Sequence, residues 1–310
     1  MIIHSTASAP GKINIFFAVG PLLNDGYHEV VSIYQALDLR ETVSVSASTE
    51  WSVSVTGILS ADQLAAVPTG EDNLVVKAAK QIAEISGITE PQKLNFEISK
   101  NVPVAGGMGG GSADAAAALL AVNKFWGTEL DQAQLLAAAA SLGADIPFAI
   151  LGGTAVGTGR GENLSAVAEV KTLHWVLVAN SNGLSTPRVY ARLDELRKDR
   201  GEDPSDVSTP LVPAALIYAL QSGDAIQVAK HLHNDLQEAA VDLMPELLET
   251  MNQGLEAGAL AAMVSGSGPT IALLASDEGS ANQIANRLAI QGHYAIATFG
   301  PAIGTVLESI

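Results

Sequence analysis

A cluster of glycines a third of the way along the chain constrains the fold more than any other feature. Five of the six residues at 106–111 are glycine. The cluster follows an alternating stretch at 94–99, typical of a strand, and precedes an alanine-rich stretch at 112–124 with the pattern of a helix. Glycines before a helix N-terminus let backbone N–H groups approach an anion, and the helix dipole favours the anion's binding. We therefore expect a phosphate-binding loop, with Ser112 as the N-cap of the helix.

This loop does not match the two commonest phosphate-binding motifs. No Gly-Lys-Ser/Thr ends it, so it is not a Walker A loop. Gly107, Gly109 and the small Ser112 fit a dinucleotide motif only loosely, and no early βαβ unit surrounds them. A dinucleotide-dependent oxidoreductase is therefore the weakest interpretation. A flexible surface linker is also disfavoured, because a linker seldom lies between a strand and an uninterrupted helix.

Composition limits the class of protein further. The 310 residues include 16 Lys+Arg and 33 Asp+Glu, a formal net charge of −17 at pH 7. That charge argues against nucleic acid and against an anionic membrane surface as partners. No apolar run approaches the ~18 residues of a membrane-spanning helix, and the first residues do not resemble a signal peptide. The absence of cysteine excludes disulfides and thiolate chemistry and fits the cytoplasm, where we expect the protein.

Strand and helix patterns alternate along both halves of the chain, so we expect an α+β fold with two domains. A soft boundary near 165–172 divides it into residues 1–168 and residues 169–310. The patterns predict strands at 13–19, 28–38, 42–47, 52–57, 94–99, 173–180 and 293–299, and helices at 112–124, 187–198, 224–237 and 245–256.

Two charged residues stand where packing alone does not explain them. Lys12, in APGKIN at 9–14, begins an apolar strand, either as an edge-strand gatekeeper or as a cation for a transferring phosphoryl group. Asp145, in GADIPF at 143–148, has apolar neighbours, so its carboxylate must be paired, cap a helix or act in chemistry. A third motif, SGSGPT at 265–270, is either a tight hairpin turn or a loop that closes over a phosphate.

Taken together, PGKIN, the glycine-rich stretch at 103–116 and SGSGPT resemble, in order and spacing, the three motifs of the GHMP kinase superfamily. This superfamily includes galactokinase and the homoserine, mevalonate and phosphomevalonate kinases. The resemblance implies an N-terminal domain like ribosomal protein S5 and a ferredoxin-like C-terminal domain, with the active site between them. It also implies ATP as the phosphoryl donor, with Mg²⁺ as its partner.

Further segments resemble one branch of the superfamily, which phosphorylates the 2-hydroxyl of CDP-methylerythritol in the non-mevalonate isoprenoid pathway. These segments are GYH at 26–28, EDNLVVKAA at 71–79, GADIPF at 143–148, LST at 184–186 and NDL at 234–236. The resemblance runs from about residue 5 to residue 300. A mevalonate-type or homoserine-type kinase is the nearest alternative, although such enzymes have no cytidine to hold. A catalytically silent nucleotide-binding protein is the other.

The resemblance assigns roles to individual residues. Lys12 would contact the transferring phosphoryl group and orient Asp145, which would accept the proton of the substrate hydroxyl. Tyr27 would stack on the cytosine and His28 would contact the edge of the base. The remaining substrate-side positions are Asn14 and Thr186.

The ATP-binding positions implied by the resemblance lie mostly in the glycine-rich loop. Ala113 stands where the family often has a second serine, so a hydroxyl contact there would come from Ser112. The sequence leaves the Mg²⁺ ligands and the oligomeric state open. The full set is Asn73, Lys100, Pro103, Val104, Ala105, Gly106, Gly107, Met108, Gly109, Gly110, Gly111, Ser112 and Ala113.

Overall fold

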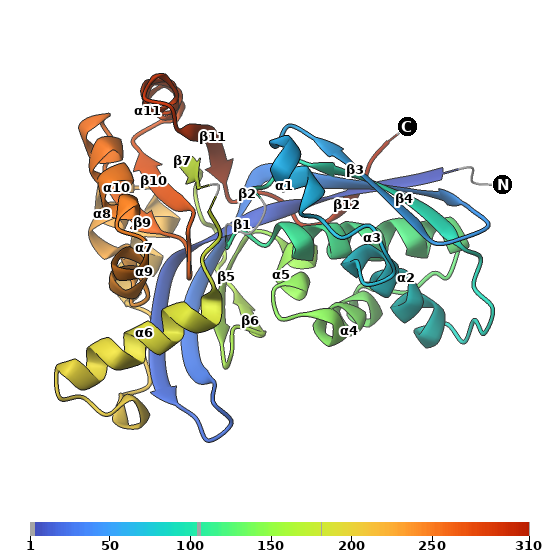
Figure 1. Cartoon of the computed structure of the whole chain (residues 1–310), viewed down its shortest axis with the longest axis horizontal. Helices are drawn as coiled ribbons and strands as arrows, with labels where there is room; N and C mark the ends of the chain where they lie inside the picture. Colours follow the sequence, from blue (N-terminus) through green and yellow to red (C-terminus); the bar gives the residue numbers. More distant parts are fainter. Residues whose placement is uncertain (1–3, 104–106, 181, 310) are drawn as a thin grey trace.

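Two β-sheets, each covered by helices, organise the chain in the computed structural model, which describes residues 4–103, 107–180 and 182–309 (Figure 1). In the larger sheet the strands run in the order β12–β1–β2–β4–β3, with β5 beside β2, β6 beside β5 and β8 beside β1. Its strands are β1 (His4–Leu22), β2 (His28–Ala47), β3 (Ser52–Gly57), β4 (Leu94–Lys100), β5 (Thr154–Thr158), β6 (Asn163–Ala166), β8 (His233–Asn234) and β12 (Val306–Leu307).

The smaller sheet has four strands in the order β11–β7–β10–β9, all antiparallel. Numbered along the chain, this order is 4-1-3-2, and helices precede its second and fourth strands, which is the ferredoxin-like arrangement. The expected α+β fold with a ferredoxin-like C-terminal part is confirmed. These strands are β7 (Leu173–Ala179), β9 (Ala261–Val264), β10 (Ile271–Ala275) and β11 (Tyr294–Gly300).

Strands β1 and β2 form one long hairpin that runs from the larger sheet past the smaller one (Figure 1). The sequence predicted shorter strands, at 13–19, 28–38 and 42–47, and this was wrong in extent. Polar residues such as Glu41 interrupt the apolar pattern, yet Glu41 is fully buried and β2 continues through it. Three register shifts along the hairpin absorb the irregular pattern, as β-bulges do.

Helix α3 forms the centre of the core beside the larger sheet. Seven of its nine buried residues are alanine or valine, and their small side chains let its backbone approach β1 and β2 closely. The helices of the first half are α1 (Ala61–Ala65), α2 (Leu74–Ile85), α3 (Gly110–Trp126), α4 (Gln132–Leu142) and α5 (Ile146–Leu151). Helices α2, α4 and α5 lie on the same side of the sheet as α3, whereas α1 lies beside β3 (Figure 1).

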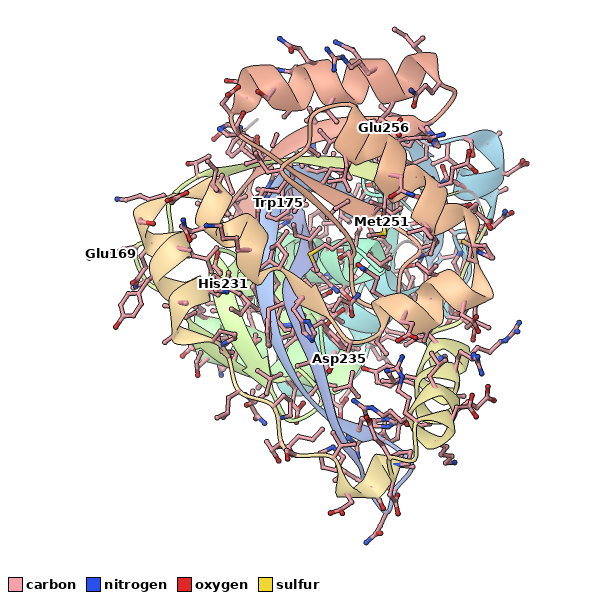
Figure 2. The ribbon with its side chains drawn as sticks, turned by 90° about the vertical axis from the view of Figure 1, so that its left-hand side faces the viewer. Glu169, Trp175, His231, Asp235, Met251 and Glu256 are labelled. Atoms are coloured by element: carbon pink, nitrogen blue, oxygen red, sulfur yellow. The ribbon has the colours of Figure 1, made fainter. Side chains whose placement is uncertain are left out.

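In the second half, helices enclose the smaller sheet. Figure 2 shows Trp175 and Met251 beneath these helices, whereas Glu169 and Glu256 lie at the outside. Trp175 is fully buried, and its Nε1 donates to Gln35 Oε1 at 2.8 Å, which links the smaller sheet to β2. The helices are α6 (Thr186–Asp199), α7 (Ala214–Ser222), α8 (Ala225–His231), α9 (Gln237–Leu243), α10 (Glu246–Glu256) and α11 (Glu278–Ile290).

The single helix predicted at 224–237 is wrong. Helix α8 ends at His231, the backbone becomes extended at Leu232, and β8 then pairs in parallel with β1 before α9 begins. This pairing joins residues more than 200 positions apart, so the local periodicity could not reveal it. No helix among residues 4–103, 107–180 and 182–309 combines the length and apolar character needed to cross a bilayer.

Candidate active site

The larger sheet aims Lys12 and Asn14 at the same space. They lie two residues apart on β1, and register shifts between Pro10 and Lys12 and between Asn14 and Phe16 bracket them. Bulges of this kind redirect side chains beside functional sites. Lys12 Nζ donates to Asn14 Oδ1 at 2.8 Å and lies 3.7 Å from Asp145 Oδ2. The structure therefore brings together the lysine and the aspartate that the sequence singled out.

Asp145 precedes α5 and occupies its N-cap position. Within the described ranges, however, its carboxylate accepts no capping hydrogen bond from the helix. The side chain is 37% exposed and faces the buried Lys12. Of the three roles that the sequence allowed for this carboxylate, the geometry therefore favours pairing with a cation at an open surface over capping.

Asn14 is buried and its hydrogen bonds fix its orientation. Its Nδ2 donates to Ser32 Oγ at 2.7 Å, and Ser32 Oγ donates in turn to the carbonyl of Phe16 at 3.0 Å. Its backbone N–H donates to Ser265 Oγ at 3.2 Å, in the SGSGPT loop. Because Nδ2 is committed to Ser32, Oδ1 is left facing Lys12.

The described part of the glycine-rich loop lies directly against Lys12. The backbone N–H of Lys12 donates to the carbonyl of Met108 at 3.0 Å. Gly109 has a left-handed φ of 70° and forms the N-cap of α3, so the prediction of Ser112 as N-cap is wrong. The left-handed turn, which glycine adopts without strain, starts the helix earlier and leaves Ser112 as its third residue.

A hollow of about 330 Å³ opens beside the N-terminus of α3. Among the described residues, α3 has no side-chain cap, so its first N–H groups face this space without one. Val104, Ala105 and Gly106 lie outside the described residues. The predicted ATP-binding positions that line the hollow are Lys100, Pro103, Gly107, Met108, Gly109, Gly110, Gly111 and Ser112.

Two residues that were predicted to bind ATP, Asn73 and Ala113, have structural roles instead. Asn73 is the N-cap of α2, with its Oδ1 accepting from Val75 N–H at 2.9 Å, and only its neighbour Leu74 lines the hollow. Ala113, the fourth residue of α3, is fully buried in the core.

Lys100 is enclosed by two carboxylates. Its Nζ lies 2.7 Å from Asp114 Oδ2 and 2.6 Å from Glu41 Oε1, and all three side chains are buried. Burial, aided by the charge of Asp114, raises the pKa of Glu41 to about 7, and burial raises the pKa of Asp114 as well. The cluster therefore brings no net positive charge to the hollow, and the source of positive potential lies elsewhere.

A second, larger hollow of about 770 Å³ contains the GYH motif. Tyr27 is exposed, and the guanidinium of Arg160 lies 4.1 Å from its ring centroid. His28 is buried, with its Nε2 lying 3.0 Å from Asp194 Oδ1 and its ring stacked on Tyr190 at 5.3 Å between centroids. The hollow thus offers two aromatic faces and an imidazole edge.

The SGSGPT loop joins the remaining motifs to the site. Thr186, at the start of α6, shares a 2.8 Å hydrogen bond with Ser267. Asn234 Nδ2 donates to the carbonyls of Val264 at 2.8 Å and Gly266 at 2.7 Å. The LST and NDL motifs therefore hold this loop in place over the strand that carries Lys12.

The two hollows are connected by a third, of about 240 Å³, that Lys12, Asn14 and Asp145 line. It shares Gly107 and Gly109 with the hollow at α3, and Arg160, Thr186 and Tyr190 with the hollow at Tyr27. The result is a continuous groove with the lysine–aspartate pair near its middle.

Sequence reasoning missed several residues of this groove. Tyr190 and Asp194 are four residues apart in a stretch predicted to be helical, so their common face could have been noticed. Arg160 lies in a second glycine-rich stretch, GTGRGE at 157–162, whose pattern by itself indicates turns rather than a ligand site. Asn234 was seen as part of a motif, but its hydrogen bonds to the SGSGPT loop depend on tertiary contacts.

The fold and the groove define a class, the small-molecule kinases of the GHMP type. The family described as GHMP kinases N terminal domain matches residues 73–153, and the one described as GHMP kinases C terminal matches residues 216–293. Solved structures agree on the fold: a mevalonate kinase from L. major superposes with a TM-score of 0.75 at 15% identity, over 96% of each chain.

More similar relatives narrow the class. A protein of Leifsonia xyli subsp. xyli is 48% identical over 96% of each chain, and one of Clavibacter michiganensis subsp. michiganensis is 47% identical over 98% of this chain and 95% of its own; each is named 4-diphosphocytidyl-2-C-methyl-D-erythritol kinase. A crystal structure of 4-(cytidine 5'-diphospho)-2C-methyl-D-erythritol kinase is 29% identical over 96% of this chain and 100% of its own, with a TM-score of 0.76. The chain belongs to the 4-diphosphocytidyl-2-C-methyl-D-erythritol kinase family of the GHMP kinases.

Proposed function

We propose that this protein transfers the γ-phosphoryl group of ATP to the 2-hydroxyl of 4-diphosphocytidyl-2-C-methyl-D-erythritol, giving the 2-phosphate and ADP. The observation that supports this most directly is the continuous groove. A loop suited to phosphates lies at one end, a hollow suited to a nucleobase lies at the other, and Lys12 and Asp145 stand between them.

In this proposal the phosphates of ATP lie at the N-terminus of α3. The N–H groups there, which no side chain of the described residues caps, and the helix dipole favour a polyanion. Gly107 also brings the loop close to the SGSGPT loop, since a Cβ at this residue would lie 3.0 Å from the carbonyl oxygen of Ser265. The two loops would then enclose the triphosphate from opposite sides.

The cytidine diphosphate of the substrate would fill the larger hollow. Tyr27 would stack on the base and His28 would contact its edge. Arg160 lines both this hollow and the central one, so it places a cation between the base and the reacting hydroxyl. Thr186 and Asn14 line the central hollow and would lie beside the methylerythritol moiety.

Lys12 and Asp145 would act on the reacting groups. As the substrate oxygen forms its bond to the γ-phosphorus, the bond from that phosphorus to the bridging oxygen of ADP breaks, and the hydroxyl proton passes to Asp145. The ammonium of Lys12 would stabilise the charge on the transferring group. Phosphoryl transfer depends mainly on positioning and charge stabilisation, so Asp145 can accept the proton late, when the new P–O bond has largely formed.

Mg²⁺ would accompany ATP, because one lysine cannot balance a triphosphate. Among the described residues there is no cluster of three or more His, Asp or Glu side chains arranged to hold a metal. Mg²⁺ bound with ATP does not require such a cluster, because it retains waters and is usually held by substrate phosphates with one or two carboxylates. The hydroxyl of Ser112, which lines the hollow at α3, would supply a protein oxygen, and the ion would neutralise charge on the phosphates.

The organisation of the chain supports this arrangement. We propose that one domain spans residues 1–168 and the other residues 169–310, because every strand of the smaller sheet begins at or after Leu173. Strands β8 and β12 return to the larger sheet, so the two domains share strands and the groove lies where they meet. We also propose the cytoplasm, which supplies ATP, as the site of action.

The deciding experiment is a coupled assay of ADP release with three acceptors: CDP-methylerythritol, mevalonate and homoserine. We expect turnover with CDP-methylerythritol alone, and ³¹P NMR should show a new phosphomonoester on its 2-oxygen. Turnover with only mevalonate or only homoserine would refute the proposed substrate. ATP binding without turnover of any acceptor would indicate a silent nucleotide-binding protein, and NAD(P) binding without ATP binding would indicate an oxidoreductase.

A further inference from the structure

The carboxylate behind His28 is a feature that the proposed chemistry does not use. Asp194 Oδ1 lies 3.0 Å from His28 Nε2, and the two side chains are 15% and 4% exposed. An ionised carboxylate only accepts hydrogen bonds, so Nε2 must be the donor of this bond. In a neutral imidazole the proton then resides on Nε2, and Nδ1 carries a lone pair.

Helix α6 holds the imidazole from two sides. Tyr190 and Asp194 are four residues apart and so share one face of the helix, which lies alongside the hairpin of β1 and β2 (Figure 1). Tyr190 stacks on the ring with an interplanar angle of 26°, while Asp194 binds Nε2. No residue in the described part of the chain hydrogen-bonds Nδ1, and His28 lines the hollow of about 770 Å³. Nδ1 is thus the ring nitrogen left for a ligand.

We propose that Asp194 is a positioning residue that locks His28 in its Nε2–H tautomer, and that this lock makes the hollow select cytosine over uracil. The inference rests on the proposed function, which places a cytidine nucleotide in this hollow. At the 4-position of the pyrimidine, cytosine carries an amino group that donates, whereas uracil carries a carbonyl oxygen that accepts. The lone pair of Nδ1 pairs with the first and opposes the second.

The role of the Asp194 carboxylate is to prevent His28 from changing its tautomer to suit uracil. Without Asp194, moving one proton from Nε2 to Nδ1 would turn the available nitrogen into a donor that suits uracil. With Asp194 present, that tautomer sets the lone pair of Nε2 against a carboxylate that has no proton to donate. Specificity commonly requires such a penalty against the wrong ligand, in addition to a good contact with the right one. Leaving a site's polar group unpaired is an effective form of rejection.

The variant Asp194→Asn tests this directly. The amide has the shape of the carboxylate but can present either its oxygen or its NH₂ to Nε2, so it supports both tautomers. Calorimetric titrations with CDP and UDP, in the presence of saturating ADP, give the ratio of their Kd values. We expect the wild type to prefer CDP by roughly 100-fold, and Asp194→Asn to lower this preference about tenfold or more, mainly through tighter UDP binding.

The matched control is Asp199→Asn, an exposed aspartate at the end of the same helix. It should keep the wild-type ratio. An unchanged ratio in Asp194→Asn, with CDP still bound, would overturn the role assigned to Asp194.

A second measurement observes the tautomer of His28 in the wild-type protein. Long-range ¹H–¹⁵N spectra of the wild type with CDP, with His28 assigned through His28→Gln, show which ring nitrogen carries the proton. We expect protonated Nε2 and unprotonated Nδ1, and the reverse would overturn the proposal. Neither readout needs turnover. A chain that shows the expected ratio but phosphorylates no CDP-methylerythritol would refute the proposed reaction and leave the role of Asp194 standing. Turnover without the base preference would do the opposite.

Discussion

Lys12 donates a hydrogen bond of 2.8 Å to Asn14, its neighbour two residues along the same face of β1. This contact is shorter than the 3.7 Å separation between Lys12 and Asp145. The asparagine is itself oriented by Ser32. The ammonium is therefore positioned mainly from within its own strand, and it shares with the carboxylate a hollow in which a substrate group can contact both.

We therefore expect Asn14→Ala to reduce kcat by about 10- to 100-fold, because a misplaced charge loses much of its effect on the transition state. The KM for ATP should change little, since Asn14 does not line the hollow at α3. Steady-state kinetics at saturating acceptor provide the measurement. The control is Asn252→Ala on the exposed side of α10. A wild-type kcat in Asn14→Ala would show that Lys12 does not depend on this hydrogen bond.

The reacting pair itself is tested by Lys12→Met and Asp145→Asn. Each should lower kcat by at least about 100-fold, the usual loss on removing a general base or a charge that stabilises the transition state. Asp145→Asn should still bind ATP within a few-fold of the wild type, as measured by calorimetry, because the phosphates are held elsewhere. The controls Lys124→Met and Asp62→Asn alter exposed charges outside the groove. Turnover near the wild-type value would show that the altered residue does not take part in the reaction.

The buried cluster at Lys100 predicts a pH dependence of stability. The pKa of Glu41 is raised from 4.5 to about 7, first by burial and then by the charge of Asp114. A carboxyl whose pKa is raised on folding contributes most to stability below pH 4.5, and that contribution is lost as the pH rises through about 7. The native protein should therefore lose stability between pH 5 and 8 for this reason.

The variant Glu41→Gln removes this titration. Relative to the variant, the wild type should lose up to roughly 3 kcal/mol of unfolding free energy from pH 5 to pH 8. Urea denaturation at a series of pH values gives the comparison, with the exposed Glu97→Gln on β4 as control. Parallel pH profiles for the wild type and Glu41→Gln would contradict the prediction.

A second pH-dependent pair joins β8 to β1, in the region labelled at Asp235 in Figure 2. Asp235 accepts from the Val19 N–H at 2.7 Å and from His233 Nε2 at 2.6 Å. Burial acts to raise the pKa of Asp235, but these hydrogen bonds outweigh it and lower the pKa below its ordinary 3.8. The hydrogen bond to Asp235 raises the pKa of His233 above 6.5.

The directions of these two pKa shifts define the pH range in which the pair stabilises the folded protein. The contribution of Asp235 is present above pH 3.8 and lost as the pH falls through its lowered pKa. The contribution of His233 is present below pH 6.5 and lost as the pH rises through its raised pKa. Asp235→Asn should therefore cost most near pH 5.5, about 1 kcal/mol for this partly exposed pair, and less at pH 8.5. Chemical denaturation at the two pH values measures it. Asp242→Asn, which breaks an exposed pair with Arg192, should show no such pH dependence, and equal losses for Asp235→Asn at both values would disprove this pH range.

Some features could be predicted from the sequence because they depend on residues that are adjacent in the chain. The glycine-rich loop, the strand before it and the helix after it follow from local pattern and from the conformational freedom of glycine. The same holds for α6, predicted at 187–198 and observed at Thr186–Asp199. Lys12 and Asp145 were identified because each charge stood in an apolar context that gave it no local partner.

Other features could not be read locally. Ser112 has the chemistry of an N-cap, yet the left-handed Gly109 starts the helix before it. Lys100 was expected to present its charge to the nucleotide, and only the fold reveals that Glu41, 59 positions earlier, lies against it. Likewise, the segment predicted as one helix at 224–237 contains β8, because residues 233 and 234 pair with the distant strand β1.

By itself the sequence determined which chemical groups the protein has and which of them lack a local reason for their position. It indicated a phosphate loop, a lysine, an aspartate and a Tyr-His pair, in an order that predicts a kinase of one superfamily. The tertiary structure decided which charges remain available. It pairs Lys100 with buried acids, leaves Lys12 and Asp145 3.7 Å apart at an open groove, and places Asp194 behind His28. The reason is physical: the effect of a charge depends on its partners and its burial, and both are set by residues distant in the chain.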